Sequence, residues 1–81
     1  MKAVYIEEHG GVEALTYGDV PEPAVGANDV KVRVRATSLN RLDLFTRAGV
    51  RGTRIDLAGP HILGGDTAGD VVEFGGEVTG L

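Results

Sequence analysis

The clearest hydrophobic pattern in the chain begins at residue 29. Between residues 30 and 35, three valines alternate with three cationic residues. This period of two predicts a strand whose valine face (Val30, Val32 and Val34) is buried and whose cationic face is solvated. The segment is therefore expected to form a half-buried strand.

After residue 38 the pattern changes to helical spacing. Leu42, Phe45 and Ala48 recur on one face of a helix, and Asn40 belongs to the residue types that cap helix N-termini. Gly49 can adopt the left-handed conformation with which many helices end. We therefore expect one or two turns of helix directly after the strand.

Three polar residues, Asn40, Arg41 and Asp43, lie at this strand-to-helix corner. Asp43 follows the cap by three residues, so its carboxylate can accept a hydrogen bond from an N-terminal amide, and it precedes Arg47 by four, the favourable order for an ion pair. Partial positive charge collects at a helix N-terminus. Two interpretations stay open: the residues only cap the helix and face water, or they bind a small anion.

Other segments are predicted to be extended and to be separated by turns. His9, beside two glycines and without an acid or thiol at metal spacing, is expected in a surface turn. Pro21-Glu22-Pro23 excludes a helix in its connection. The connection 49–59 has a length typical of functional or mobile loops. The extended segments are residues 1–8, 14–19, 67–74 and, after a turn at Gly75-Gly76, 77–81.

Composition indicates one small domain that is mainly β. The chain has 81 residues, 13 of them glycine and none cysteine, which favours many turns and excludes disulfides and thiolate ligands. Short strands, a single short helix and Gly/Pro punctuation are typical of a small, irregular β-barrel or sandwich. No apolar signal core or membrane-spanning run occurs, so we expect a cytoplasmic protein without a membrane partner.

Charge is distributed unevenly along the chain. The net charge is −4, yet seven of the eight Lys and Arg residues fall within 31–54, where Asp43 is the only acid. This predicts a basic zone on an acidic body. Only four residues are aromatic and no groove-reading motif accompanies the cations, so a nucleic-acid partner is not expected. A solvated strand face accounts for most of these cations, and a small anionic ligand near Arg41 is the alternative.

Several common chemistries lack their sequence signatures. There is no nucleophile motif for Ser38, and the two histidines have no zinc-ligand spacing. The segment GGDTAG at 64–69 misses the dinucleotide fingerprint and precedes a strand instead of a helix. Asp66 and Asp70 could form a carboxylate pair or could simply lie side by side in solvent. The residues alone therefore indicate a small β domain with a polar corner.

Three ordered blocks closely resemble the N-terminal part of the medium-chain dehydrogenase/reductase superfamily, whose catalytic domain contains a GroES-like barrel. The blocks are MKAVYIEEHGG, VPEPAVGANDVKVRVRATSLNRLDLFTRAG and PHILGGDTAGDVVEFGGEVTGL, and they cover nearly the whole chain. The resemblance implies a partial GroES-like irregular β-barrel with one short helix, with residues 1–81 forming the N-terminal part of that catalytic domain.

The resemblance also implies that the catalytic zinc of the alcohol dehydrogenases is missing here. Asn40 stands where those enzymes have a cysteine ligand, Leu42 where they have a relay hydroxyl, and Gly65 where they have a histidine, while Asp66 replaces a glutamate. Losing thiolate, imidazole and hydroxyl together removes two ligands and the relay. The pattern is similar to the zinc-free, quinone-oxidoreductase-like branch, and no metal ligand is assigned.

In that branch the corner residues acquire roles. The resemblance implies that Arg41 contacts the pyrophosphate of NAD(P)H and that Asn40 is an amide donor near the nicotinamide or the substrate carbonyl. Asp43 is grouped with Asn40 as a catalytic residue because it braces the corner. The implied reaction is hydride transfer from NAD(P)H to a quinone, enone or related carbonyl compound.

Family members continue into a Rossmann cofactor domain, which is absent from these residues. We therefore expect residues 1–81 to be inactive alone, although a full-length parent would be an oxidoreductase. Uncovered apolar faces and strand edges favour a homo-oligomer. Two alternatives remain: a zinc-type alcohol dehydrogenase relative with only a structural zinc, or a stand-alone GroES-like interaction barrel without chemistry.

Overall fold

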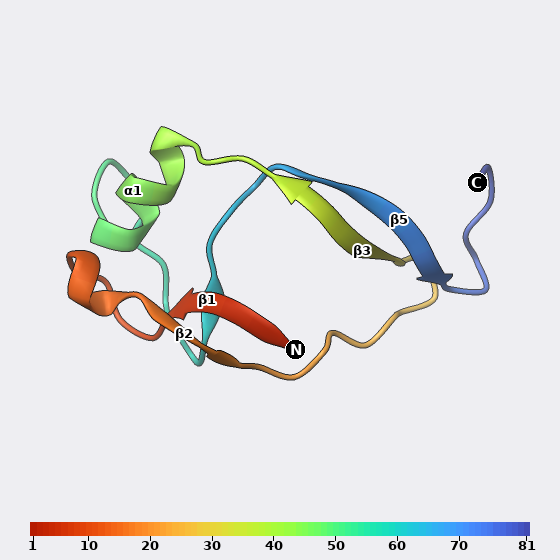
Figure 1. Ribbon diagram of the computed structural model, residues 1–81, viewed down its shortest axis with the longest axis horizontal. Helices are drawn as coiled ribbons and strands as arrows, with labels where there is room; N and C mark the ends of the chain where they lie inside the picture. Colours follow the sequence, from red (N-terminus) through yellow and green to blue (C-terminus); the bar gives the residue numbers. More distant parts are fainter. The chain divides into compact units, whose positions relative to one another are not determined.

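The computed structural model describes all 81 residues, and the chain divides into two compact units. One unit comprises Met1–Pro21 and Leu39–Gly65, and the other comprises Glu22–Ser38 and Asp66–Leu81. The chain crosses between the units more than once, as the colours of Figure 1 show. These are the first unit and the second unit, respectively.

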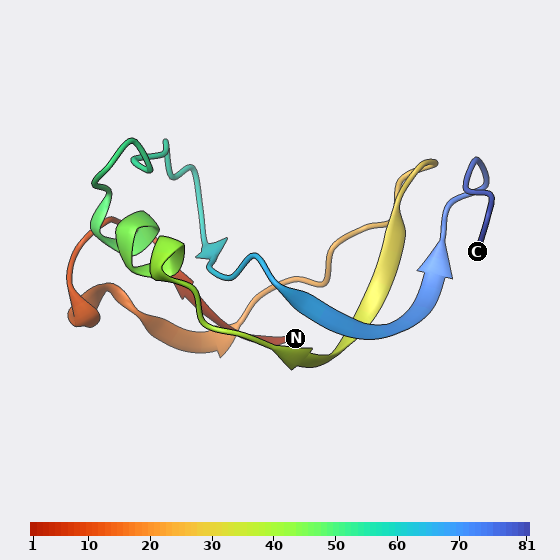
Figure 2. The same ribbon diagram turned by 90° about the horizontal axis from the view of Figure 1, so that it is seen from above.

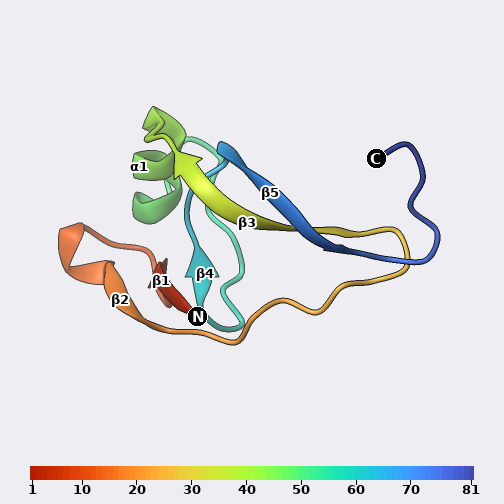
Figure 3. The same ribbon diagram turned by 45° about the vertical axis from the view of Figure 1, so that its right-hand side comes forward.

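The first unit contains a three-stranded antiparallel sheet in the order β2-β1-β4. Its strands are β1 (Lys2–Ile6), β2 (Thr16–Asp19) and β4 (His61–Ile62), and Figure 3 shows β4 beside β1. A short 3-10 turn, η1 (Val12–Ala14), connects β1 to β2. The second predicted strand is therefore shorter than expected, because its first residue, Ala14, belongs to this turn.

The core of the first unit is small. Ile6 is fully buried and Val20 is 7% exposed. The Met1 ammonium donates to the Val20 carbonyl at 2.8 Å, and the Val20 amide donates to the Met1 carbonyl at 2.8 Å. These two hydrogen bonds tie the start of β1 to the residue that follows β2.

The second unit is a two-stranded antiparallel ribbon of β3 (Val30–Thr37) and β5 (Thr67–Phe74). The register shifts between Lys31 and Val32 and again between Val34 and Ala36, so that Val72 and Arg35 each lack a cross-strand partner. The two shifts have opposite sense and restore the register. Such bulges bend a strand, and Figure 2 shows β5 bending along its length.

The prediction of a mainly β chain with one short helix is confirmed, although the strands form two open sheets and no closed barrel. Two further details of the predicted fold were wrong. The valines of β3 are not buried, since Val30, Val32 and Val34 are 39%, 40% and 56% exposed on a ribbon that has no second layer within its unit. Residues 77–81 form no strand, because the Glu77 amide donates to the Ala27 carbonyl and a turn follows Gly75.

Gly69 provides a test of the ribbon geometry. A Cβ atom at this position would collide with the backbone carbonyl oxygen of Arg33. Gly69→Ala should lower the free energy of unfolding by about 1–3 kcal/mol in a urea titration, because the strands must separate locally. Gly76→Ala is the matched control, since a Cβ there meets nothing within 4 Å. Equal stabilities of the two variants would contradict the close approach.

Candidate functional site

The predicted corner is divided between the two units, because the boundary falls between Ser38 and Leu39. Its helical half is α1 (Arg41–Ala48) in the first unit. The predicted helix, its cap at Asn40 and its end at Gly49 are all confirmed, and Gly49 has the expected left-handed backbone with φ of 74°. The polar residues Asn40, Arg41 and Asp43 therefore all lie in the first unit, at the N-terminus of α1.

A capping box fixes the N-terminus of α1. The Leu42 amide donates to Asn40 Oδ1 at 3.0 Å, and the Asn40 amide donates to Asp43 Oδ2 at 3.0 Å. Both bonds satisfy helix-end amides that lack a partner within the helix. The predicted reach of Asp43 back to an N-terminal amide is thus confirmed, and the conformation of the Asn40 side chain is set by a bond to its oxygen.

The capping box leaves two donor groups available at the helix N-terminus. Asn40 uses its side-chain oxygen for the cap, and none of the hydrogen bonds within the chain involves its amide nitrogen. Arg41 is exposed and takes part in none of the three ion pairs. An amide and a guanidinium therefore lie in consecutive positions where the helix dipole favours negative charge.

The predicted ion pair between Asp43 and Arg47 does not form. Arg47 Nε instead donates to the Gly10 carbonyl at 3.3 Å, and the Gly10 amide donates to the Arg47 carbonyl at 2.8 Å. Arg47 therefore joins the last turn of α1 to the loop after β1. An exposed i,i+4 pair contributes only a few tenths of a kcal/mol, so this reciprocal contact readily replaces it.

His9 lies in the loop after β1, where the sequence predicted a turn, and its ring makes contacts that were not predicted. Its Nδ1 donates to the Thr46 carbonyl at 2.8 Å, and its Nε2 accepts from the Ile55 amide at 3.1 Å. The ring also packs against Gly49, where a Cβ would lie 2.8 Å from His9 Cγ. His9 thereby holds the end of α1 and the following connection, a role that no local pattern signals because its partners are 37 and 46 residues away.

One depression of about 210 Å³ lies in the first unit beside α1. Asp43 is among its lining residues, whereas Asn40 and Arg41 are not. No sequence pattern signals that two of its polar members, Thr46 and His61, line one depression, because they lie on separate elements of the chain. The full lining is Leu42, Asp43, Thr46, His61, Ile62, Leu63, Gly64 and Gly65.

Asp66 and Asp70 do not form a carboxylate pair in the second unit. Asp66 Oδ2 accepts from Ser38 Oγ at 3.1 Å, and its backbone carbonyl accepts from Thr37 Oγ1 at 2.7 Å. Asp70 accepts from Arg35 Nε at 2.8 Å. Each carboxylate therefore has its own partner, and Asp66 also lines a depression of about 260 Å³ formed by residues 36–38 and 66–68.

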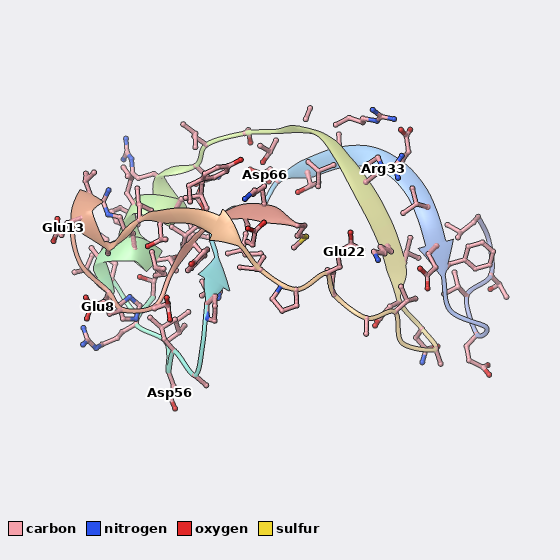
Figure 4. All side chains as sticks on the ribbon, turned by 60° about the horizontal axis from the view of Figure 1, so that its bottom comes forward. Glu8, Glu13, Glu22, Arg33, Asp56 and Asp66 are labelled. Atoms are coloured by element: carbon pink, nitrogen blue, oxygen red, sulfur yellow. The ribbon has the colours of Figure 1, made fainter.

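The cations do not form a single zone on one unit. Lys31, Arg33 and Arg35 belong to β3 of the second unit, and the other four of the basic segment belong to the first. Glu22, labelled in Figure 4, accepts from Lys31 Nζ at 2.9 Å. This hydrogen bond lowers the pKa of Glu22 and raises the pKa of Lys31, so part of the cationic strand face is neutralised locally.

Substitution of Asn40 tests the capping box. Asn40→Ala removes the acceptor for the Leu42 amide and should lower the free energy of unfolding by about 1 kcal/mol, whereas Asn40→Ser keeps an acceptor and should differ from the original protein by only a few tenths. Urea titrations of the variants measure both values. If the alanine variant were as stable as the serine variant, Asn40 would not act as a cap.

The pair of Glu22 and Lys31 predicts a dependence of stability on pH. Because the pKa of Glu22 is lowered in the folded protein, its contribution is present above the ordinary value of 4.5 and is lost as the pH falls through the folded pKa. Glu22→Gln should therefore be less stable than the original protein at pH 6, and the difference in urea midpoint between the two proteins should shrink steadily as the pH is lowered below 4.5. Glu77→Gln is the control, since its carboxylate forms no ion pair. A gap that persists in acid would contradict the assignment.

Comparison with known proteins identifies the family of this chain. Residues 26–81 match the family model described as the alcohol dehydrogenase GroES-like domain. The chain is 40% identical over 78 residues to a trans-enoyl reductase of Aspergillus flavipes, covering 96% of the chain and 21% of that protein. It is 36% identical over 84 residues to an NAD-dependent alcohol dehydrogenase of Sulfolobus acidocaldarius, covering 100% of the chain and 24% of that protein.

A solved structure supports the same assignment. The quinone oxidoreductase from Coxiella burnetii superimposes with a TM-score of 0.89 and 32% sequence identity, covering 100% of this chain and 26% of that protein. The chain thus spans about a quarter of the length of the proteins it matches. No helix of the chain combines the length and the apolar character required to cross a bilayer. With more than half of its residues matching the family model, the chain belongs to the alcohol dehydrogenase GroES-like domain family.

Proposed function

We propose that residues 1–81 form the N-terminal part of the catalytic domain of an NAD(P)H-dependent, zinc-free oxidoreductase that transfers hydride to a quinone, enone or related carbonyl compound. Similarity to a quinone oxidoreductase and to a trans-enoyl reductase supports this class. The observation that carries the proposal is the pair of free donors, the Asn40 amide and the Arg41 guanidinium, at the capped N-terminus of α1. Residues 1–81 alone are expected to be inactive.

Arg41 is the proposed contact to the cofactor. Its exposed guanidinium has no acidic partner within the chain and occupies the first position of α1, so the residues present fit a phosphate group. Arginine can donate two parallel hydrogen bonds to phosphate oxygens. When bound, NAD(P)H supplies the hydride. Arg41 would hold its pyrophosphate and so limit the orientations of the cofactor.

Asn40 and Asp43 act together in this proposal. With its oxygen held by the Leu42 amide, Asn40 can present only its amide hydrogens to a carbonyl oxygen of the substrate or of the nicotinamide. Such a preorganised donor stabilises negative charge that develops on that oxygen. Asp43, which accepts from the Asn40 backbone amide, is proposed to position Asn40.

The absence of a catalytic zinc remains a prediction from the ligand set. The chain has no cysteine, and no three His, Asp or Glu side chains cluster so as to hold a metal. Zinc prefers three or four ligands drawn from Cys sulfur, His nitrogen and carboxylate oxygen, and no such set comes together here. The similarity to an alcohol dehydrogenase supports the alternative of an alcohol dehydrogenase relative, for which the family resemblance implies a structural zinc only. Metal analysis of the full-length protein separates the two.

Self-association is also proposed. Val32 is 40% exposed on β3 and Phe74 is 57% exposed on β5, so the ribbon presents apolar side chains that a second copy can cover. Light scattering of the full-length protein should give a mass above that of the monomer. A monomeric mass at high concentration would exclude this part of the proposal.

Steady-state kinetics of the full-length protein test the enzymatic proposal. NAD(P)H oxidation with 2-cyclohexenone or 1,4-benzoquinone should be observed. Arg41→Ala should raise the KM for NAD(P)H about ten- to hundredfold, since a charged hydrogen bond contributes about 1.5–3 kcal/mol, with a smaller effect on kcat. Arg54→Ala, which removes another exposed guanidinium without an ion pair, is the control and should leave KM unchanged.

Asn40→Asp distinguishes the capping function of the side-chain oxygen from the proposed catalytic function of the side-chain amide hydrogens. The carboxylate keeps an acceptor for the Leu42 amide but removes the amide hydrogens, so stability should be retained while kcat falls about tenfold or more. Full activity of this variant would contradict the role of Asn40 as a donor. An unchanged KM for NAD(P)H in Arg41→Ala would contradict the phosphate contact.

A further inference from the structure

His9 lies at the C-terminal end of α1, where the helix carbonyls have no partners within the helix. Its Nδ1 is 2.8 Å from the Thr46 carbonyl oxygen, and the amide of the next residue, Gly10, donates to the Arg47 carbonyl at 2.8 Å. The last carbonyls of a helix need partners from outside it, and partial negative charge collects there. The loop after β1 therefore caps this end of α1, and within that cap only the His9 ring can take up a proton.

The other ring nitrogen of His9 faces both backbone groups of Ile55. Nε2 is 3.1 Å from the Ile55 carbonyl oxygen and 3.1 Å from the Ile55 amide nitrogen. Because Nδ1 faces the Thr46 carbonyl, it carries a hydrogen in either protonation state, so Nε2 is an acceptor in the neutral ring and a donor in the charged ring. The neutral ring therefore accepts from the Ile55 amide, and the charged ring can donate to the Ile55 carbonyl.

Ile55 belongs to the segment between α1 and β4, called here the α1–β4 connection. Near the helix this segment is held locally, since Thr53 Oγ1 donates to the Phe45 carbonyl at 2.7 Å. Residues 54–59 take part in no hydrogen bond within the chain other than those between Ile55 and His9. His9 therefore provides the whole hydrogen-bonded attachment of this stretch, from a position 46 residues away in the chain.

The charged groups around His9 come from the β1–β2 loop, α1 and the α1–β4 connection. None of them forms an ion pair with His9 or with another member of the set. Arg47 donates to the Gly10 carbonyl, and Glu13 accepts from the Gly11 amide. Since acids and bases are nearly equal in number, the two carbonyl oxygens and the helix end are what distinguish the two protonation states of the ring. The set is Glu7, Glu8, Glu13, Arg41, Asp43, Arg47, Arg51, Arg54 and Asp56, of which Glu8, Glu13 and Asp56 are labelled in Figure 4.

We propose that His9 is a pH-sensitive latch on the α1–β4 connection, which passes from the Ile55 amide to the Ile55 carbonyl when the ring takes up a proton and holds the connection more tightly in its charged form. Imidazole is the side chain whose charge ordinarily changes between about pH 5 and 8. Hydrogen bonds from a charged donor are stronger than neutral ones, and a cation is favoured at a helix C-terminus. The latch is independent of the proposed function, because it concerns the attachment of a segment and involves no substrate or cofactor.

NMR of the full-length protein with nitrogen-15 in its histidines and isoleucines tests the change of partner. At pH 8, correlations between the ring hydrogens and nitrogens should show a hydrogen on His9 Nδ1 and none on Nε2, and at pH 5 both nitrogens should carry one. The Ile55 amide signal should shift with the same midpoint as His9 Nε2, because it loses its acceptor. A hydrogen on Nε2 at pH 8, or an Ile55 amide signal that does not follow the ring, would overturn the proposal.

Hydrogen exchange tests whether the charged ring holds the connection more tightly. The protection of the Thr53 amide, which donates to the Val50 carbonyl, is expressed relative to the exchange of an unfolded peptide at the same pH. This protection should rise about fivefold from pH 8 to pH 5, because a charged hydrogen bond replaces a neutral one. The Glu77 amide, which donates to the Ala27 carbonyl in the second unit, is the control and should keep its protection. Equal or lower protection of Thr53 at pH 5 would overturn the tightening.

Variants of the two histidines assign the effect to one ring. His9→Gln offers an oxygen that can accept from the Ile55 amide but does not titrate, so the protection of Thr53 should no longer depend on pH. His61→Gln removes the other histidine of this chain and should keep the dependence. A dependence that persists in His9→Gln or disappears in His61→Gln would overturn the assignment. If His9→Gln does not fold, the ring-nitrogen measurement on the original protein still decides.

Discussion

The fixation of α1 at both ends is the constraint on which the candidate site depends. A helix of eight residues is marginal by itself, since few of its amides and carbonyls find partners within it. The capping box closes the N-terminus, and Gly49 with His9 closes the other end. Because both ends are held, Asn40 and Arg41 occupy defined positions at the N-terminus, and Thr46 occupies a defined position at the depression beside α1.

The ribbon of the second unit is organised by a different constraint, its two opposed register shifts. They cancel, so the cross-strand pairing at both ends of the ribbon is in the same register while its middle is bent. The close approach at Gly69 belongs to this bent region. Ion pairs of Glu22 with Lys31 and of Arg35 with Asp70 then neutralise part of the cationic face without burying it.

The two parts of α1 present different chemical environments. Its first turn presents donors beside the positive end of the helix dipole, an environment suited to phosphate and to a developing oxyanion. Further along, Leu42 and Thr46 face a depression that combines an apolar wall with neutral donors. One short helix therefore contributes both the donors on which the proposed function rests and part of the wall of this depression.

The sequence by itself determined the features that depend on residues a few positions apart. The cap at Asn40, the reach of Asp43, the left-handed end at Gly49 and the extent of β3 all follow from local periodicity and turn chemistry. Tertiary structure alone decided the features that depend on distant segments. His9 contacts residues 37 and 46 positions away, and Arg47 donates to the Gly10 carbonyl instead of pairing with Asp43. Thr46 and His61, from separate elements, line the same depression. It also left the valines of β3 exposed, because periodicity identifies an apolar face and only a packed second layer can bury it.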